Sequence, residues 1–93
     1  METVAKHIVV HGRVQGVGFR YFVQRAGDRM ALTGNVANCP DSTVEIFVQG
    51  DAKEVGRFIQ EIEKGPAIAR VDRIDVRDAV PRGNYSGFLI EGR

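Results

Sequence analysis

The sequence predicts a small α+β sandwich of order βαββαβ, with two helices on one face of an antiparallel four-stranded sheet. Three observations support this prediction. The 93 residues allow one domain, residues 1–93, with a single hydrophobic core. Apolar residues alternate with polar ones in the segments that we expect to be strands. Two segments with helical spacing of apolar residues separate the first strand from the second and the third from the fourth.

The first predicted strand covers residues 6–14, where apolar and polar residues alternate loosely. The face that we expect to be buried carries Ile8, Val10 and Val14. The opposite face carries His7, Val9, His11 and Arg13. This alternation is typical of a strand that is buried mainly on one side.

From residue 19 the apolar period changes to that of a helix. The repeat consists of Phe19, Phe22, Val23, Ala26 and Met30. The spacing predicts a helix over residues 18–30, followed by Gly34. Gly27 lies inside this helix, where glycine costs about 0.5–1 kcal/mol relative to alanine.

A short strand over residues 33–37 and the turn residues Pro40-Asp41-Ser42 come next. In the third predicted strand, Val44, Ile46 and Val48 alternate with Glu45, Phe47 and Gln49. Asp51 is a favourable N-cap for a second helix, which Gly65-Pro66 ends. The apolar repeat of this helix is Val55, Phe58, Ile59 and Ile62.

The fourth predicted strand has Ile74 and Val76 between charged residues, and Val71 is out of phase with them. A β-bulge or a late start of the strand would explain this phase change. Residues 83–87 read as a loop, and residues 88–90 could add a short edge strand. The complete order is that of the ferredoxin-like fold, which hosts many functions and therefore does not select one.

Composition excludes several classes of protein. The formal net charge is only +1, so nothing indicates attraction to nucleic acid or to an anionic membrane. No apolar run approaches the roughly 20 residues of a membrane span, and no signal peptide is recognisable. Cys39 is the single cysteine, which excludes an internal disulfide and a two-cysteine metal site. We expect a cytoplasmic monomer.

The connection between the first strand and the first helix has the composition of an anion-binding loop. It reads Gly12-Arg13-Val14-Gln15-Gly16-Val17-Gly18-Phe19-Arg20. Glycine lets backbone N–H groups approach a ligand closely, and a helix start leaves N–H donors unpaired at the positive end of the helix dipole. Phosphate is a common ligand of such loops.

Arg20 is placed unusually for a helix start. A cation in the first turn is disfavoured by the helix dipole, by roughly 0.3–1 kcal/mol when it is exposed. An anion between the guanidinium and the backbone donors would explain its position. An ordinary surface arginine after a flexible turn explains the local pattern equally well.

Other known motifs do not fit this loop. A Walker loop would continue with Gly-Lys-Ser/Thr, and the dinucleotide fingerprint would have glycine where Tyr21 stands. A metal carrier of this fold would need paired cysteines. An RNA-recognition sheet would show several exposed aromatic residues, whereas the third strand offers only Phe47.

Other polar residues have ordinary explanations. His7 and His11 are more simply solvated sheet residues than metal ligands, since no third ligand lies near them in sequence. Cys39 is read as incidental, and the Arg and Asp residues between 70 and 78 as a solvated charge ladder. Asn38 could start an Asx-type turn or point across the sheet towards the anion-binding loop. Sequence spacing does not separate these two roles.

The chain resembles the acylphosphatase family over nearly its whole length. Residues 12–20 are similar to the first signature of the family and residues 34–38 to the second, with further support from Val44-Glu45-Ile46 and Gln49-Gly50. The chain departs from the family pattern at three places. They are Asn35 in place of an aromatic residue, Ala31 in place of a helix-ending glycine, and residues 39–43 in place of a more glycine-rich turn.

The resemblance implies hydrolysis of the carboxyl–phosphate bond of acyl phosphates, with a small-molecule acyl phosphate as the partner and no metal or other cofactor. It implies phosphate binding by the backbone N–H groups of Gln15, Gly16, Val17, Gly18, Phe19 and Arg20. It implies that the Arg20 guanidinium binds the same group and that Asn38 orients the attacking water. This suits the chemistry, because an acyl phosphate has a good leaving group and needs positioning and charge stabilisation more than a strong base.

Two other functions stay open. One is a carbamoyl-phosphate-handling module like the acylphosphatase-like domain of a larger hydrogenase-maturation protein, although we expect no further domain after Arg93. The other is a non-catalytic module that binds a small anion and regulates a partner.

Overall fold

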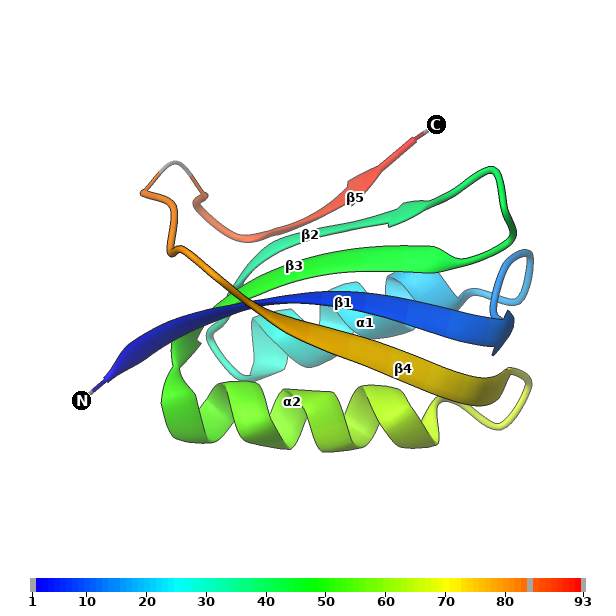
Figure 1. Cartoon of the computed structure of the whole chain (residues 1–93), viewed down its shortest axis with the longest axis horizontal. Coiled ribbons are helices and arrows are strands. Elements are labelled where there is room, and N and C mark those ends of the chain that lie inside the picture. The colour runs from blue at the N-terminus through cyan, green and yellow to red at the C-terminus, as the bar shows by residue number, and fades with distance from the viewer. Residues whose placement is uncertain (1, 84, 93) are drawn as a thin grey trace.

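The computed structural model describes residues 2–83 and 85–92, and it confirms the predicted βαββαβ order (Figure 1). A fifth strand follows these six elements at the C-terminal end. The elements are β1 (Thr3–Arg13), α1 (Phe19–Arg29), β2 (Thr33–Asn38), β3 (Val44–Asp51), α2 (Ala52–Lys64), β4 (Arg70–Ala79) and β5 (Phe88–Glu91). Neither described helix is long and apolar enough to cross a membrane.

The sheet is mixed and has five strands, in the order β4-β1-β3-β2-β5. Four of its strands pair antiparallel, as predicted, whereas β5 pairs parallel with β2. The four antiparallel strands and the short edge strand considered at residues 88–90 are therefore confirmed, and the complete sheet is mixed with five strands rather than antiparallel with four. The run at residues 88–90 was too short for its partner or direction to be read from sequence, because parallel pairing depends on contacts far apart in the chain.

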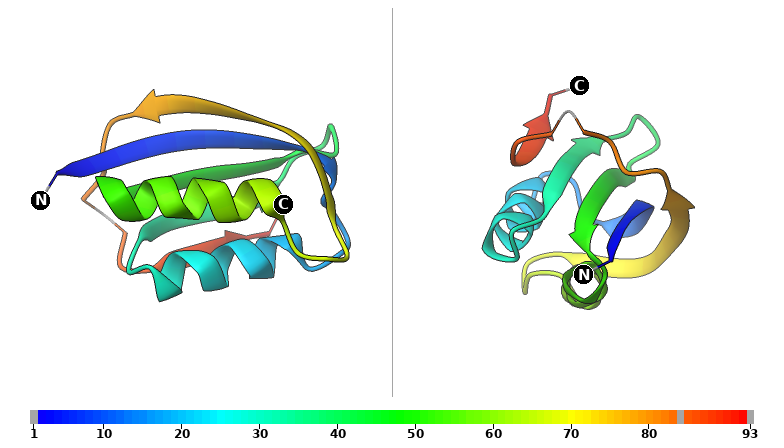
Figure 2. Two further views of the ribbon diagram at one scale, coloured as in Figure 1. Left: turned by 90° about the horizontal axis from the view of Figure 1, so that it is seen from below. Right: turned by 90° about the vertical axis from the view of Figure 1, so that its left-hand side faces the viewer.

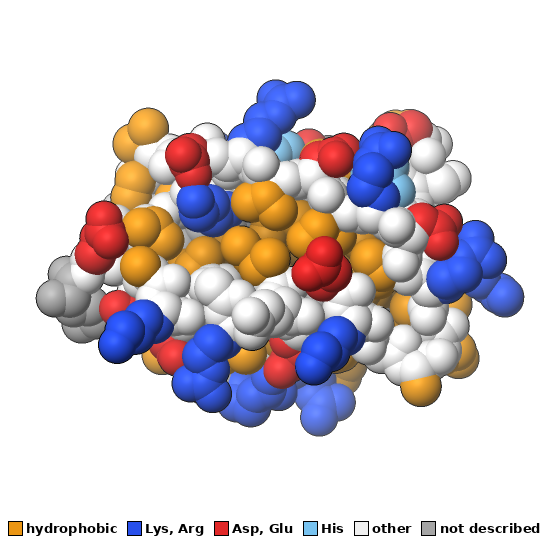
Figure 3. All heavy atoms as spheres, turned by 60° about the horizontal axis from the view of Figure 1, so that its bottom comes forward, with side chains coloured by type: hydrophobic (Ala, Val, Ile, Leu, Met, Phe, Trp, Pro, Cys, Tyr) orange, Lys and Arg blue, Asp and Glu red, His pale blue; other side chains and the backbone are white. Residues whose placement is uncertain are grey.

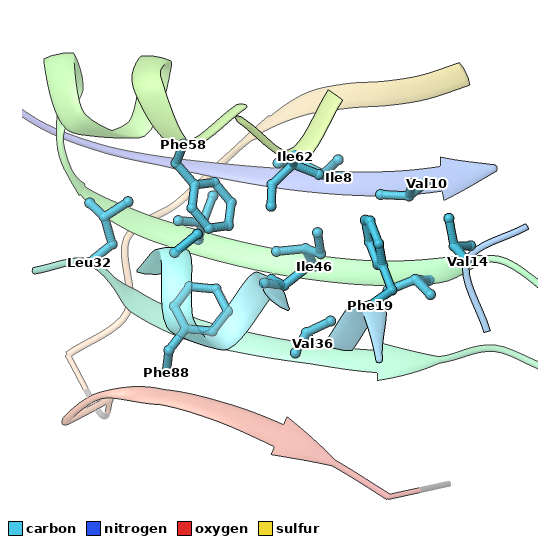
Figure 4. Packing of buried hydrophobic residues seen from close by; sticks show 14 of the residues in the cluster. Ile8, Val10, Val14, Phe19, Leu32, Val36, Ile46, Phe58, Ile62 and Phe88 are labelled. Atoms are coloured by element: carbon cyan, nitrogen blue, oxygen red, sulfur yellow. The ribbon is translucent and has the colours of Figure 1, made fainter. Parts of the chain in front are cut away.

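Both helices cover the same face of the sheet, and the core lies between these two layers (Figure 2). The alternation in β1 and β3 is as predicted, with Ile8, Val10 and Ile46 fully buried. Phe88 also turns its ring into this layer, where its centroid lies 5.6 Å from that of Phe58 (Figure 4). This contact packs β5 against the core.

The irregularity predicted around Val71 is a bulge in β4. His11 of β1 pairs with Arg73, but the next residue, Gly12, pairs with Val71, so Asp72 is the extra residue. Gly12 has φ of 135°, and a Cβ there would collide with the backbone of β4. The glycine therefore allows the close approach of the two strands at the bulge.

Helix α1 ends in a Schellman motif, in which Leu32 N–H donates to Gly27 O at 2.9 Å and Ala31 N–H to Asp28 O at 3.1 Å. Ala31 takes the left-handed position of this motif with φ of 57°. Asp51 occupies the N-cap position of α2 as predicted, but its side chain makes no capping hydrogen bond among the described residues.

The solvent-facing side of the sheet differs from expectation at one aromatic residue. Phe47 is only 4% exposed. Tyr85 stacks on it with ring centroids 5.4 Å apart, and the Arg82 guanidinium lies 4.3 Å from its ring centroid. Both residues come from the segment that connects β4 with β5. The predicted loop at residues 83–87 belongs to this segment, and its Asn84 lies outside the described residues.

Charged residues line the edge strand β4, as predicted. Ion pairs join Arg70 to Asp72, Arg73 to Asp75 and Lys6 to Asp78. On the side shown in Figure 3, Lys, Arg, Asp and Glu side chains flank a band of hydrophobic side chains. The charges of β4 keep an exposed sheet edge hydrated, which is how many proteins prevent edge-to-edge association.

Candidate active site

The connection between β1 and α1 turns back sharply through two glycines. Gly16 has φ of 72° and Gly18 has φ of 77°, both in the left-handed region that favours glycine. A Cβ placed on either glycine would meet no described atom within 4 Å, apart from its own neighbours. The space in front of this backbone is therefore open to a ligand.

The start of α1 offers backbone N–H donors to that space. Phe22 N–H makes the first hydrogen bond of the helix, to Gly18 O at 3.0 Å. The N–H groups of Phe19, Arg20 and Tyr21 precede it, and among the described residues no side chain caps them. The first turn contains no acidic residue. This is the arrangement in which a helix start binds an anion.

Arg20 is held in place from the C-terminal strand. Its Nη1 donates a hydrogen bond to the backbone oxygen of Glu91 at 3.1 Å, and the side chain is half-buried. Sequence reasoning missed this contact, because a backbone carbonyl 71 residues away has no residue-type signature. Strand β5 thus fixes the direction of the guanidinium, which retains further donors for an anion.

Asn38 ends β2 and faces the same space. Its Oδ1 is buried and has no hydrogen-bond partner among the described residues. Buried polar atoms are nearly always paired in native proteins, so an unpaired one calls for an explanation. An amide oxygen of this kind can accept a hydrogen bond from a water molecule or from a ligand.

A cavity of about 170 Å³ brings these groups together. Arg20 and Asn38, which are 18 residues apart in sequence, both line it. The full lining is Val14, Gly16, Gly18, Phe19, Arg20, Tyr21, Asn38 and Ile90. Of the residues predicted for the site, Gln15 and Val17 lie outside this lining. Val17 packs against the core instead.

The Gln15 side chain joins the two halves of the site. Its Nε2 donates to Cys39 O at 2.9 Å and to Thr43 O at 2.8 Å. One side chain in the β1–α1 connection therefore links this connection to the turn that follows Asn38. Sequence reasoning assigned only the backbone of Gln15 to the site, because no local pattern reveals a side-chain contact between distant segments.

The turn after Asn38 is ordered by its own polar side chains. Asp41 Oδ1 accepts hydrogen bonds from Thr43 N at 3.1 Å and from Thr43 Oγ1 at 2.5 Å. The hydrogen bonds from Thr43 hold the pKa of Asp41 below its usual value. Ser42 has φ of 76° in this turn. The Asx-type role considered for Asn38 is therefore filled by Asp41.

The remaining candidate residues contribute to structure. His11 Nε2 lies 2.9 Å from Asp75 Oδ2, and His7 Nε2 lies 3.3 Å from Glu45 Oε2. Within residues 2–83 and 85–92, no group of three or more His, Cys, Asp or Glu residues could hold a metal ion. Cys39 contributes its backbone oxygen to Gln15, as described above.

Comparisons with known proteins agree with this geometry. The acylphosphatase family model matches residues 6–90. An acylphosphatase of Thermococcus kodakarensis is 40% identical over 92 residues, which are 99% of this chain and 100% of that protein. The crystal structure of acylphosphatase from Bacillus subtilis superposes with a TM-score of 0.90 and 36% identity, covering 95% of this chain and 98% of that chain.

A larger protein contains a similar domain. The HypF protein of T. kodakarensis matches with a TM-score of 0.82 and 39% identity, covering 95% of this chain but only 12% of the HypF chain. The similarity therefore concerns one part of HypF.

Proposed function

The chain belongs to the acylphosphatase family, and we propose that it hydrolyses the carboxyl–phosphate bond of acyl phosphates to a carboxylate and inorganic phosphate. One observation supports this proposal above the others. The cavity at the start of α1 combines a guanidinium, open backbone donors and the unpaired amide oxygen of Asn38. A site for an anion and a site for a water molecule are thus adjacent.

The phosphoryl group binds at residues 15–20 in this proposal. The backbone N–H groups and the Arg20 guanidinium donate to its oxygens, at the positive end of the α1 dipole. These donors are arranged before the substrate arrives, because the glycine conformations fix the loop and Glu91 O fixes Arg20. Preorganised donors of this kind stabilise the charge that develops during phosphoryl transfer.

Asn38 orients the attacking water. The water donates a hydrogen bond to Oδ1, which directs its oxygen lone pair at the phosphorus atom. A new bond forms between the water oxygen and phosphorus, while the bond from phosphorus to the carboxyl oxygen breaks and leaves its electron pair on the carboxylate. The proton of the water passes to solvent. No covalent enzyme intermediate is needed.

Hydrolysis in the presence of a chelator tests this proposal. We expect turnover of benzoyl, acetyl and carbamoyl phosphate at rates that EDTA does not lower. Binding of phosphate without turnover would instead support a non-catalytic anion-binding module, and a rate that falls with EDTA would contradict metal-independent chemistry. A strong preference for carbamoyl phosphate would favour the carbamoyl-phosphate-handling alternative. The cytoplasmic location and the monomeric state stay predictions.

A further inference from the structure

A second groove opens beside the phosphate cavity. It has a volume of about 400 Å³, and its lining includes Gly18 and Tyr21, which also line the phosphate cavity. The remaining lining residues are Phe22, Arg25, Arg29, Glu61 and Pro66. Because two residues are shared, a group attached to a phosphoryl at the start of α1 can extend into this groove.

The side of the groove nearest the phosphate cavity is aromatic. The Tyr21 side chain is 59% exposed, which is unusual for a large ring with so much apolar surface. Phe22 is half-buried and packs against the core, so its position is fixed. These rings offer a flat surface to a hydrocarbon or aromatic group.

The charge of the groove comes from Arg25. Arg29 forms an ion pair with Glu61, so these two charges compensate each other. The Arg25 guanidinium carbon lies 5.7 Å from the centroid of the Tyr21 ring, and no carboxylate pairs with Arg25 among the described residues. The groove therefore has one uncompensated positive charge next to an aromatic ring.

Helix geometry brings this charge towards the phosphate cavity. Tyr21 and Arg25 are four residues apart on one face of α1, and helical side chains lean towards the N-terminus. The Arg25 backbone lies about 10 Å beyond Gly18 along the helix, from the rise of about 1.5 Å per residue. Its side chain extends towards the helix start, so that the guanidinium lies over the Tyr21 ring. An acyl group of a few carbon atoms, attached to a phosphoryl group at the helix start, would therefore end near this guanidinium.

We propose that this groove binds the acyl part of the substrate and that Arg25 favours acyl phosphates with a second negative charge at the distal end of the acyl group. The proposal rests on the proposed function, because it assumes a phosphoryl group at residues 15–20. Tyr21 would contact the body of the acyl group, and Arg25 would pair with its terminal anion.

Three rigid substrates test this selectivity, namely benzoyl phosphate, 4-methylbenzoyl phosphate and 4-carboxybenzoyl phosphate. The methyl compound controls for size. We expect wild-type kcat/KM to be highest for the carboxylate, and Arg25→Gln to lower its advantage over the methyl compound by roughly 3- to 10-fold. The selectivity is the ratio of the two kcat/KM values within each variant, so a change that affects all three substrates equally does not alter it. Added salt should also reduce the advantage.

Arg57→Gln is the matched control, since Arg57 is an exposed arginine on α2. It should leave the selectivity unchanged. Two results would overturn the proposal. One is a kcat/KM ratio of the carboxylate to the methyl compound that Arg25→Gln does not change, and the other is a ratio that Arg57→Gln changes equally. Binding of benzoylphosphonate and its 4-carboxy analogue gives a second measurement that needs no turnover. Absence of benzoyl phosphate hydrolysis would count against the proposed function, whereas equal binding of both phosphonates would count against the groove.

Discussion

The two helices of this protein begin in opposite ways. Helix α2 follows Asp51 and has Glu54 in its first turn, so negative charges complement the positive end of its dipole. Helix α1 follows Gly18 and has no acid in its first turn, so Arg20 has no acidic neighbour there, whereas Lys53 in the first turn of α2 is next to Glu54. The start of α2 is therefore arranged for stability, whereas the start of α1 gives up this stabilisation and stays open to an anion.

The helices also differ in the middle and at the end. Gly27 in α1 faces the Phe88 ring so closely that a Cβ would collide with it, whereas Gly56 in α2 faces open space. Helix α2 ends at Gly65 with φ of 68°, but α1 places Ala31 in the left-handed region. The close approach of Gly27 to Phe88 packs α1 against β5. This is the strand whose Glu91 backbone oxygen accepts the hydrogen bond from Arg20.

The largest expected effect comes from removing the cation at the start of α1. Arg20→Ala should lower kcat/KM for benzoyl phosphate by at least about 10²–10³-fold, because the phosphoryl group loses its charged partner. Removal of an exposed cation from α2, Arg57→Ala, should leave the rate within about twofold, since Arg57 pairs only with the nearby Glu54 among the described residues. Steady-state kinetics of both variants measure this contrast.

Circular dichroism should show that both arginine variants keep the wild-type fold. Near wild-type hydrolysis by a correctly folded Arg20→Ala variant would show that Arg20 does not bind the phosphoryl group. The start of α1 would then have no functional cation that α2 lacks. Arg20→Lys is a further control, and it should recover only part of the rate because an ammonium lacks the planar donor pair.

The next effect concerns the residue that faces the start of α1. Asn38→Ala should lower kcat by about 10²-fold while KM changes little, since the amide is proposed to hold water and not substrate. Steady-state kinetics over a range of acyl phosphate concentrations separate the two constants. A raised KM with unchanged kcat would show that Asn38 binds the substrate instead.

The two helix glycines should respond to alanine with opposite signs. Gly27→Ala should reduce the free energy of unfolding by about 1–3 kcal/mol, because the new methyl group displaces the Phe88 ring. Gly56→Ala should raise it by about 0.5–1 kcal/mol through helix propensity alone. Urea unfolding of both variants measures the difference. A stabilising Gly27→Ala would show that β5 does not pack on α1 as described.

The smallest effect is expected at the end of α1. Ala31→Gly should stabilise the protein by about 0.5–1 kcal/mol, since the strain of a left-handed alanine exceeds the entropy cost of glycine. A glycine with positive φ would then follow each helix, although the two ends differ in their hydrogen bonds. The melting temperature should rise by roughly 2–8 °C for a domain of this size. An unchanged or lower melting temperature would mean that Ala31 is not strained.

Periodicity predicted most of the fold, because each face of β1, β3 and the helices has one environment. The exception is β5, since residues 88–91 have no alternation and pair with a segment more than 50 residues away. Phe47 is another exception. Its alternation indicated an exposed ring, and only the tertiary structure brings Tyr85 and Arg82 over it.

The candidate site was predictable where local chemistry is unusual. Glycines in the loop and a cation at a helix start conflict with ordinary helix rules, and such conflicts are expected at functional sites. The supporting contacts were not predictable. Gln15 binds two backbone oxygens of a distant turn, and Arg20 binds the backbone oxygen of Glu91. Backbone acceptors are present at every residue, so no sequence pattern marks the ones that are used.

The most direct test is to locate the phosphate-binding site in solution. In an amide NMR titration with inorganic phosphate, we predict that the largest shifts occur at the backbone N–H groups of residues 16–20 and at the Asn38 side chain, and that they weaken strongly in Arg20→Ala. The amides at the start of α2, residues 52–54, should not move. Largest shifts at α2, or shifts at α1 that persist without Arg20, would contradict the claim that α1 is the helix built to hold the phosphoryl group.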